Sequence, residues 1–263
     1  MQPRCFRVMH HEAHDVRADC DRHWCVVLTQ VYKNALLNAM GDDIVSRLRL
    51  TPVTFELGRE MEFPGQPIRN LFFLEEGMAS MTTTFEDGSQ VEVGMFGFES
   101  VVGISALMGT KLSLNRIYTQ IAGSGYSVLI ADGRKEFLRA GLFQSLVLRY
   151  VQAQLVQTAQ SAGCNAKHSA EQRLARWLLI CTDRAHSDSF AMSHESISSM
   201  LGSTRSTVTL AAGTLKDKKL IGYSRGMLHI LDRAGLQVAA CECYHVIKNH
   251  LDNYLEYDSG LAE

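Results

Sequence analysis

Short hydroxyl side chains surround a single arginine in residues 203–207, which read Ser-Thr-Arg-Ser-Thr. Hydroxyl groups and the free backbone N–H groups of a first helical turn bind phosphate oxygens, and a long cationic side chain reaches the edges of bases. This composition therefore predicts a helix whose first turn contacts DNA.

The neighbouring residues predict the elements that would hold this turn in place. Ser193 is suited to cap a helix, in which Ile197 and Leu201 have the spacing of one buried face. Gly202 permits the left-handed backbone of a tight turn between two helices, and residues 224–226 predict a small hairpin further on. The segment is thus expected to form a helix–turn–helix followed by a β-hairpin wing.

Charge along the chain favours a DNA partner only locally. The whole chain of 263 residues has a formal net charge of −2, which argues against indiscriminate binding of nucleic acid. Residues 167–233 contain ten Lys and Arg against six Asp and Glu, so this segment carries about +4. An ordinary solvated surface is the alternative interpretation of the same charges.

Two groups of residues contain His and Cys, which are residue types that bind metal ions. In the first, no C-x-x-C or H-x-x-x-H pair lies on an evident scaffold; its members are His10, His11, His14, Cys20, His23 and Cys25. The second is Cys241, Cys243 and His245, whose i and i+2 positions would diverge by about 200° on one helix. We therefore expect no metal site.

Composition and length describe a globular chain. It is 46% hydrophobic, enough for two modest cores, and no run of about 18 apolar residues predicts a membrane span. The first residues lack the basic-then-apolar order of a secretory signal, and the seven cysteines lack the paired spacing of a secreted scaffold. We expect a reduced, cytoplasmic protein without a membrane partner.

The patterning changes along the chain and predicts five segments. They are a poorly ordered leader over 1–33, a β-roll of the effector-binding type over 34–135, a dimerisation helix over 136–165, a winged helix–turn–helix DNA-binding domain over 166–235, and a terminal helix and tail over 236–263.

Short strand-like runs separated by turn residues predict the roll. Residues 71–74, 78–81 and 91–93 are such runs, and Asp87-Gly88 predicts a tight hairpin turn. Many short strands with regular turns are typical of a small antiparallel barrel or roll. A helical pattern over about 34–50 precedes them.

A second helical pattern runs from about 134 to 162, and a break is expected at 163–165. Apolar side chains recur on it at alternating steps of three and four residues, at Leu148, Val151, Leu155 and Ala162, with Thr158 between them. Such a narrow seam is typical of two parallel helices in a dimer. Packing of the helix on its own domain is the alternative.

The order of roll, long helix and winged helix–turn–helix resembles the CRP/FNR superfamily of bacterial transcription regulators over about residues 45–235. Three segments carry the resemblance: RNLFFLEEGMASMTTTFEDGSQVEVGMFG, AEQRLARWLL and SHESISSMLGSTRSTVTLAAGTLKDKKLI. It implies an α+β fold with an N-terminal, jelly-roll-like antiparallel β-roll, a long dimerisation helix and a C-terminal winged helix–turn–helix domain. It also implies a homodimeric, sequence-specific transcription regulator that binds double-stranded DNA and has RNA polymerase as a partner.

The resemblance also assigns residues. The second helix of the motif enters the major groove in that family, so Arg205 would contact a guanine and its neighbours would form the reading edge. The DNA-binding residues that it implies are Ser193, Ser203, Thr204, Arg205, Ser206, Thr207, Thr209, Lys216 and Arg225, and Lys218 and Lys219 would add attraction for phosphate. Ordinary surface charge is the alternative for the lysines. Relatives often carry an acidic residue at the position of Ser206 and a second arginine at the position of Leu210. The DNA sequence that this chain recognises is therefore expected to differ from theirs.

The effector pocket departs from the family. Relatives that bind cyclic AMP hold its ribose with a Gly-Glu pair and its phosphate with an Arg-Ser pair; the corresponding positions are Gly103-Ile104 and Asn115-Arg116. Ile104 cannot accept a hydroxyl hydrogen bond, so cyclic AMP is not expected to bind, although Arg116 has the charge to meet an anion. Cys5, Cys20 and Cys25 lack the spacing of the iron–sulfur branch, so neither that cluster nor any other required cofactor is expected.

Two other classes of function compete with this hypothesis. In one, the roll is a ligand-binding module and the DNA contact is vestigial. In the other, the chain is an enzyme, but no Ser-His-Asp set, phosphate-binding Gly loop or paired-carboxylate motif stands out. We therefore expect a regulator without catalytic residues.

Overall fold

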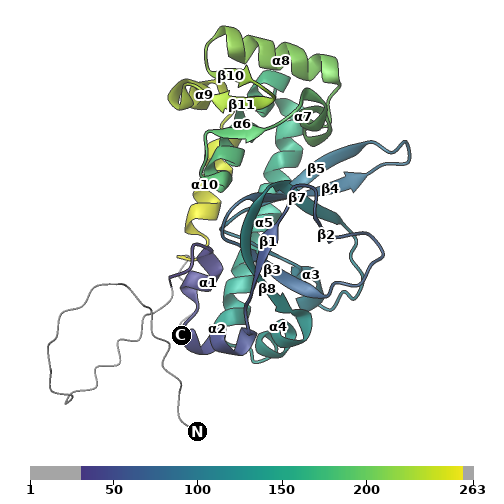
Figure 1. Cartoon of the computed structure of the whole chain (residues 1–263), viewed down its shortest axis with the longest axis vertical. Helices are drawn as coiled ribbons and strands as arrows, with labels where there is room; N and C mark the ends of the chain where they lie inside the picture. The colour runs from purple at the N-terminus through teal and green to yellow at the C-terminus, as the bar shows by residue number, and fades with distance from the viewer. Residues whose placement is uncertain (1–30, 257–263) are drawn as a thin grey trace, which may run out of the picture. The chain divides into compact units, whose positions relative to one another are not determined.

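The computed structural model describes residues 31–256 and has an α+β fold, with antiparallel sheets in the N-terminal part and mainly helices in the C-terminal part (Figure 1). A long helix, α5 (Leu142–Lys167), runs beside the sheets and leads to the C-terminal domain. Most of the predicted leader, including its His and Cys group, lies outside the described residues.

Two four-stranded antiparallel sheets form the predicted roll, with strand orders β1-β8-β3-β6 and β2-β7-β4-β5. The strands are β1 (Thr51–Phe55), β2 (Glu60–Glu62), β3 (Asn70–Leu74), β4 (Met78–Thr84), β5 (Gln90–Phe96), β6 (Val101–Val102), β7 (Arg116–Ile121) and β8 (Gly123–Leu129). The chain passes from one sheet to the other between β7 and β8. A Cβ atom at Gly123 would lie 2.0 Å from the carbonyl oxygen of Glu76, so only glycine fits this crossing.

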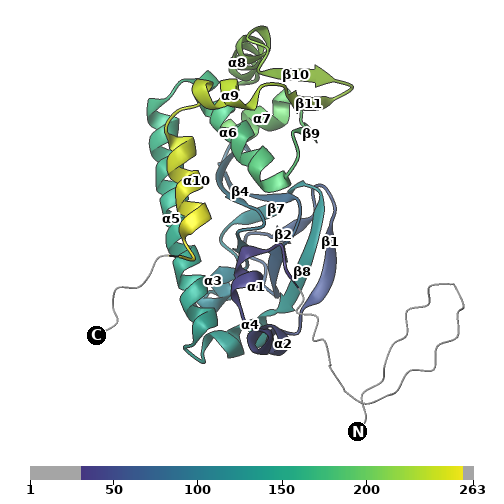
Figure 2. The ribbon, with the colours of Figure 1, turned by 90° about the vertical axis from the view of Figure 1, so that its left-hand side faces the viewer.

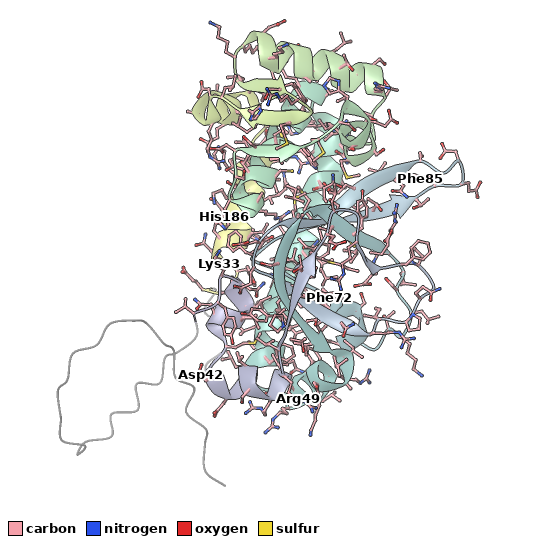
Figure 3. All side chains as sticks on the ribbon, in the orientation of Figure 1. Lys33, Asp42, Arg49, Phe72, Phe85 and His186 are labelled. Atoms are coloured by element: carbon pink, nitrogen blue, oxygen red, sulfur yellow. The ribbon has the colours of Figure 1, made fainter. Side chains whose placement is uncertain are left out.

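The hairpin of β4 and β5 turns at Asp87-Gly88, as predicted from the sequence. Gly88 has a φ of 80°, and the Asp87 carboxylate accepts a hydrogen bond from the Ser89 backbone N–H at 2.9 Å. Phe85 is exposed near the tip of this hairpin, whereas Phe72 of β3 is buried in the roll (Figure 3). The hairpin projects to the side of the roll in Figure 1, and β5 contacts α7 (His194–Leu201) of the C-terminal domain.

Both helical patterns at the ends of the roll are divided, which corrects the prediction of continuous segments. Residues 34–50 form α1 (Ala35–Ala39) and α2 (Asp42–Leu48), because Met40 adopts an extended backbone. Further on, α4 (Ile130–Phe137) ends before Ala140, whose φ of 55° prevents a continuous helix into α5. A short helix, α3 (Ile104–Leu107), follows β6.

Helix α5 continues through residues 163–165, so the predicted break there is wrong. An internal glycine costs a helix only about 1 kcal/mol relative to alanine, and packing of α5 against α10 (Cys243–Asn253) offsets this cost. The helix ends at His168, whose extended backbone is followed by a capping box: the Ser169 hydroxyl accepts from the Gln172 backbone N–H, and the Gln172 side chain accepts from that of Ser169. The boundary therefore lies where the next helix is capped.

The C-terminal domain contains a three-stranded antiparallel sheet, of order β10-β11-β9, among five helices of the described chain. Its elements are α6 (Ala170–Ala185), β9 (Ser189–Ala191), α7 (His194–Leu201), α8 (Arg205–Asp217), β10 (Ile221–Ser224), β11 (Met227–Ile230), α9 (Arg233–Ala239) and α10 (Cys243–Asn253). The predicted terminal helix is thus two helices, and α10 lies along α5 (Figure 2). Tyr244 and Ile247 of α10 are buried, and the Tyr244 hydroxyl donates to the Asp183 carboxylate of α6 at 2.9 Å. Within residues 31–256, no helix is long and apolar enough to cross a membrane.

Candidate nucleic-acid interface

Helix α7 begins and ends as its sequence predicts. The Ser193 hydroxyl accepts a hydrogen bond from the Ser196 backbone N–H at 3.0 Å and so caps the helix. Ile197, Met200 and Leu201 are buried, which directs this face of α7 into the domain. Gly202 then takes a left-handed conformation with a φ of 55°, and the chain turns into the next helix.

Helix α8 begins at Arg205 and presents one face to solvent. The Thr204 hydroxyl caps it by accepting from the Thr207 backbone N–H at 3.2 Å. Its buried residues are Val208, Ala211, Ala212 and Leu215, and its exposed residues include Arg205, Ser206, Thr209, Leu210 and Lys216. The predicted reading edge is therefore exposed along one helix whose other face holds it to the domain core.

Arg205 has the geometry of a base-reading side chain. It lies in the first turn of α8 and is 73% exposed, and its ion pair with Glu195 is long, at 3.9 Å. An exposed ion pair of this kind stabilises a protein by about 1 kcal/mol at most, so it does not hold the guanidinium away from DNA. The positive end of the helix dipole lies at the same turn and attracts phosphate.

The hydroxyls around Arg205 are already ordered by local hydrogen bonds. Thr209 donates to the backbone carbonyl of Arg205 at 2.8 Å and contacts the Nδ1 of His194 on α7 at 3.1 Å. The capping hydroxyls of Ser193 and Thr204 still carry a proton that can be donated to a phosphate oxygen. Ser203 and Thr207 are only partly exposed, and their backbone N–H groups already donate to the Ser198 carbonyl and to the Thr204 hydroxyl.

The wing is a tight hairpin between β10 and β11. Arg225 and Gly226 take left-handed conformations with φ values of 50° and 80°, as a two-residue turn of type I′ requires. Arg225 is exposed at this tip, and Lys216 is exposed in the last turn of α8. Lys218, in contrast, is bound to Glu171 of α6 at 2.6 Å, so its charge is partly neutralised within the domain.

Leu210 is a surface residue to which the sequence assigned no contact. Its side chain is 74% exposed on the same face of α8 as Arg205 and Ser206. An apolar side chain at this place has the chemistry to contact the methyl group of a thymine. His194, which orders Thr209, was likewise missed, because only the tertiary structure brings α7 and α8 together there.

Comparison with known proteins agrees with this geometry. The family model described as "Crp-like helix-turn-helix domain" matches residues 172–239. A global nitrogen regulator of Nostoc sp. is 30% identical over 183 residues, which cover 65% of this chain and 81% of that protein. The chain belongs to the CRP/FNR family.

Other relatives of this CRP/FNR regulator match over more of its length. A global nitrogen regulator of Synechococcus elongatus is 26% identical over 214 residues, 78% of this chain and 96% of that one. Among solved structures, FixK2 from Bradyrhizobium japonicum superposes with a TM-score of 0.63 at 18% identity, over 74% of this chain and 98% of that one. A CRP-family regulator of Thermus thermophilus has a TM-score of 0.60 at 21% identity, over 72% and 96%. The chain is thus a sequence-specific, DNA-binding transcription regulator of the CRP/FNR type.

A buried carboxylate connects the roll of this CRP/FNR regulator to its DNA-binding domain. Glu92 of β5 accepts hydrogen bonds from the Trp177 indole N–H of α6 at 2.8 Å and from the Ser80 hydroxyl at 2.5 Å. Burial raises the pKa of Glu92 to about 7, although these two hydrogen bonds and the nearby Arg184 and Arg176 act to lower it. The contact therefore joins the two domains through a group that titrates near neutral pH.

Glu92→Gln is expected to remove a pH dependence of stability. The native protein retains a proton on Glu92 that the unfolded chain, with a pKa near 4.5, has released, so the wild-type free energy of unfolding falls between about pH 4.5 and 7. Glutamine stays neutral, so the free energy of unfolding of the variant relative to the wild type should rise over this range, by up to about 3 kcal/mol. Urea unfolding across this range measures the difference.

The exposed Glu56 provides the matched control for this experiment. Glu56→Gln should follow the wild-type dependence on pH. If the free energies of unfolding of the wild type and of Glu92→Gln changed in parallel with pH, Glu92 would not be protonated in the native protein at these pH values.

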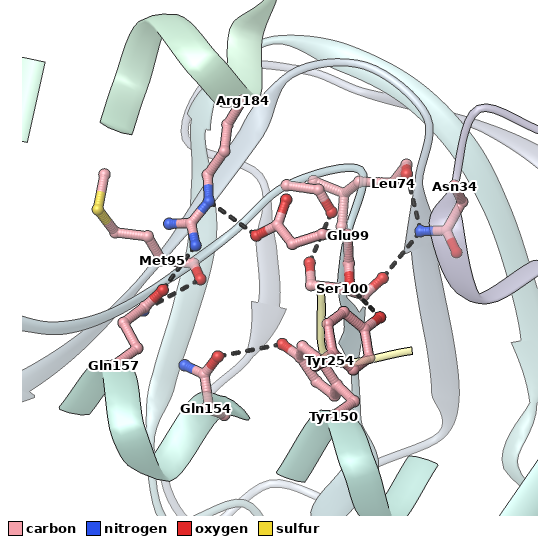
Figure 4. Close-up of polar contacts among 11 residues, drawn as sticks. Asn34, Leu74, Met95, Glu99, Ser100, Tyr150, Gln154, Gln157, Arg184 and Tyr254 are labelled. Atoms are coloured by element: carbon pink, nitrogen blue, oxygen red, sulfur yellow. Dashed lines mark hydrogen bonds and ion pairs between the residues drawn. The ribbon is translucent and has the colours of Figure 1, made fainter. Parts of the chain in front are cut away.

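A second buried contact between the domains is an ion pair. The Nε of Arg184 in α6 lies 2.7 Å from the carboxylate of Glu99, and both side chains are less than a tenth exposed. Arg184 also donates to the Gln157 side chain of α5 at 2.6 Å, and Tyr254 donates to the backbone carbonyl of Glu99 at 2.6 Å (Figure 4). This network ties α6 to α5, to the roll and to the residue that follows α10.

The four predicted effector-pocket residues contact different neighbours. The backbone N–H of Gly103 donates to the Glu62 carboxylate, and the Ser113 hydroxyl donates to the same group; burial raises the pKa of this carboxyl. Ile104 is the first residue of α3, and Asn115 is half-buried. Arg116 binds Glu60 at 2.6 Å and Gln90 at 3.0 Å and lies over the ring of Tyr118. The Ser113 hydroxyl also hydrogen-bonds to the backbone of Asn115, so Gly103 and Asn115 are linked through Glu62 and Ser113. The contacts of Arg116 belong to a separate group around Glu60 and Gln90.

The predicted seam of α5 is largely exposed in the single chain. Leu148 and Leu155 are 50% and 65% exposed, Ala162 is exposed and Val151 is half-buried. The opposite face of the helix packs on its own chain through Leu146, Val147 and Tyr150, which are buried. Intramolecular packing thus uses a different face of α5 and leaves the seam uncovered.

Proposed function

We propose that this regulator acts as a homodimer in which each α8 enters the major groove of one DNA half-site. The observation that carries the proposal is the pairing of two exposed surfaces on one chain: the apolar seam of α5 and the polar face of α8 that begins at Arg205. Two-fold pairing along a helix seam presents two reading helices about one DNA turn apart. The dimer interface includes Leu148, Val151, Leu155 and Ala162.

The contacts divide into base reading and phosphate binding. Arg205 reads a guanine, with Ser206, Thr209 and Leu210 on the same face. Phosphates are bound by the hydroxyl groups of Ser193, Ser203, Thr204 and Thr207 and by the charges of Lys216 and Arg225. The exposed face of α8 has few long side chains that can reach bases. A larger share of the specificity for the DNA sequence therefore comes from Arg205 and from DNA shape.

Binding of a random DNA pool by the full-length protein tests this function. Repeated selection should enrich a two-fold symmetric site, and the protein should bind that site more tightly than bulk competitor DNA at physiological salt. Equal affinity for the site and for bulk DNA would favour the alternative, a ligand-binding roll whose DNA contact is vestigial.

We further infer that the roll does not bind cyclic AMP. Ile104 offers no acceptor for the ribose, the Gly103 N–H is used by Glu62, and Arg116 is bound to Glu60 and Gln90. Calorimetric titration with cyclic AMP should therefore give no saturable heat, and DNA affinity should be the same with and without it. Saturable binding at micromolar concentration would contradict this inference.

The remaining partners follow from the family. We infer that the protein is cytoplasmic and that it acts by binding DNA, without catalysing a reaction. We also infer that it changes transcription by contacting RNA polymerase at the promoter. A transcription assay on the selected site with purified polymerase measures this effect. An unchanged transcript level on adding the regulator would contradict it.

A further inference from the structure

Four potential metal ligands come together where α5 ends and α10 begins. They are Cys164, His168, Cys241 and Cys243, whose ligand atoms all lie within 4.8 Å of one another. The three cysteines are at most 3% exposed and form a buried cluster apart from the main core, and the His168 side chain is 12% exposed. Such a group of thiols in a closed site has the composition of a metal centre.

The backbone explains why the sequence did not reveal this group. Cys164 lies in the last turn of α5, and its carbonyl accepts from the backbone N–H of His168, the residue that caps this helix, at 3.0 Å. Cys241 precedes α10 and Cys243 is its first residue, so these two cysteines do not lie on one regular helix. The expectation that these two side chains diverge is therefore wrong, and exposed His245 is not part of the group.

The distances fit a single tetrahedral ion. The Sγ atoms of Cys164 and Cys241 are 3.5 Å apart, and the Cys243 Sγ lies 3.6 Å from the His168 Nδ1. A zinc ion bound tetrahedrally at about 2.3 Å from sulfur and 2.0–2.1 Å from nitrogen places two sulfurs about 3.8 Å apart and a sulfur and a nitrogen about 3.6 Å apart. In an iron–sulfur cluster the four protein ligands are divided among two or more irons, and ligands on different irons lie farther apart than the 4.8 Å that encloses these four atoms.

We propose that Cys164, His168, Cys241 and Cys243 bind one zinc ion. Three thiolates and one imidazole form a closed Cys3His set, which is typical of structural zinc and leaves no position for substrate. Soft sulfur ligands select against magnesium and calcium, which prefer oxygen. The three thiol protons are released when the ion binds.

Neighbouring groups complete the site as a second layer around the ligands. With Nδ1 of His168 on the metal, its Nε2–H points to the Glu242 carboxylate at 3.3 Å, which is the usual partner for a zinc-bound imidazole. The Gln160 side chain donates to the Cys243 Sγ at 3.0 Å. Arg176 and Arg173 of α6 interact electrostatically with Cys164, which offsets the negative charge of three thiolates.

The position of the site gives the ion a structural role. His168 caps the C-terminal end of α5, and Ser169 caps α6, the first helix of the DNA-binding domain. Of the other two ligands, Cys241 lies between α9 and α10, and Cys243 is the first residue of α10. The ion therefore fixes the terminal helix to the dimerisation helix and stiffens the junction at which the DNA-binding domain begins.

Metal analysis of the full-length protein, purified with reductant and without chelator, tests the proposal. We expect about one zinc per chain. Cobalt exchanged into the site should give the intense visible bands of tetrahedral coordination and a sulfur-to-cobalt charge-transfer band. Cys243→Ser and His168→Asn should lose the zinc, whereas the controls Cys181→Ser, Cys20→Ser and His245→Asn should retain it. Glu242→Gln should retain the ion with about 10- to 100-fold weaker affinity.

A second measurement uses the wild type alone, in case a ligand variant fails to fold. A strong chelator should lower its thermal midpoint, and zinc or cobalt, but not magnesium, should restore it. The proposal is overturned if the wild type contains no more zinc than Cys243→Ser and also takes up no added cobalt. A Cys164–Cys241 disulfide in freshly purified, metal-free protein would also overturn it. None of these readouts depends on DNA binding, so they stand or fall separately from the proposed function.

Discussion

Arg205→Ala is expected to abolish the preference for one base pair in each half-site while leaving binding to random DNA nearly unchanged. A bidentate arginine–guanine contact discriminates by about 1–3 kcal/mol, and a symmetric dimer makes it twice, so about 2–6 kcal/mol should be lost at the selected site. Each 1.4 kcal/mol is a tenfold change in affinity. Fluorescence anisotropy with the selected site, and with variants of it at each position, measures the loss.

Arg225→Ala is the matched control for this experiment, because it removes the same side chain from the tip of the wing. A phosphate contact carries no base preference, so this variant should bind all sequences more weakly and show a shallower dependence on salt. Base preferences identical to those of the wild type in Arg205→Ala would exclude Arg205 from base reading.

Leu155→Glu is expected to convert the proposed dimer into folded monomers. Leu155 is 65% exposed in the single chain, so the substitution removes no intramolecular core contact, but in a dimer it would bury two carboxylates in the seam. DNA affinity for the two-half-site sequence should fall about 100-fold or more, because linked binding of two half-sites is lost. Sedimentation velocity measures the mass, and anisotropy measures the affinity.

Val238→Glu provides the control for this substitution. Val238 lies on α9 and is 87% exposed, so the variant adds the same charge to an apolar helical position away from α5. It should remain dimeric with wild-type affinity. A dimer that survives Leu155→Glu, with Leu148→Glu also dimeric, would contradict the assignment of the seam.

The DNA-reading segment was predictable from the sequence because its signals are local. Ser193 and Thr204 cap the two helices, Gly202 supplies the turn, and Arg225-Gly226 closes the wing, all as the residue types indicate. Each of these features depends on hydrogen bonds between residues a few positions apart. The roll was predictable for a similar reason, since its strands are short and its turns carry glycine.

Helix boundaries were less predictable, because the period of apolar residues continues across a break. The pattern gave no sign that α4 and α5 are separate, or that α5 passes through Gly163 and ends only at His168. Capping by Ser169 and the left-handed backbone at Ala140 decide these ends. A pattern of buried positions reports which face is covered, and it does not report where the backbone turns.

The sequence by itself therefore determined the family, the helix–turn–helix with its wing and the face of α5 that is largely exposed. Only the tertiary structure decided that Glu92 is buried against Trp177, and that Cys164 and His168 meet Cys241 and Cys243. These contacts join residues about 75 to 85 positions apart. Their distance depends on how whole helices and strands pack, and a local pattern of residue types carries no information about that packing.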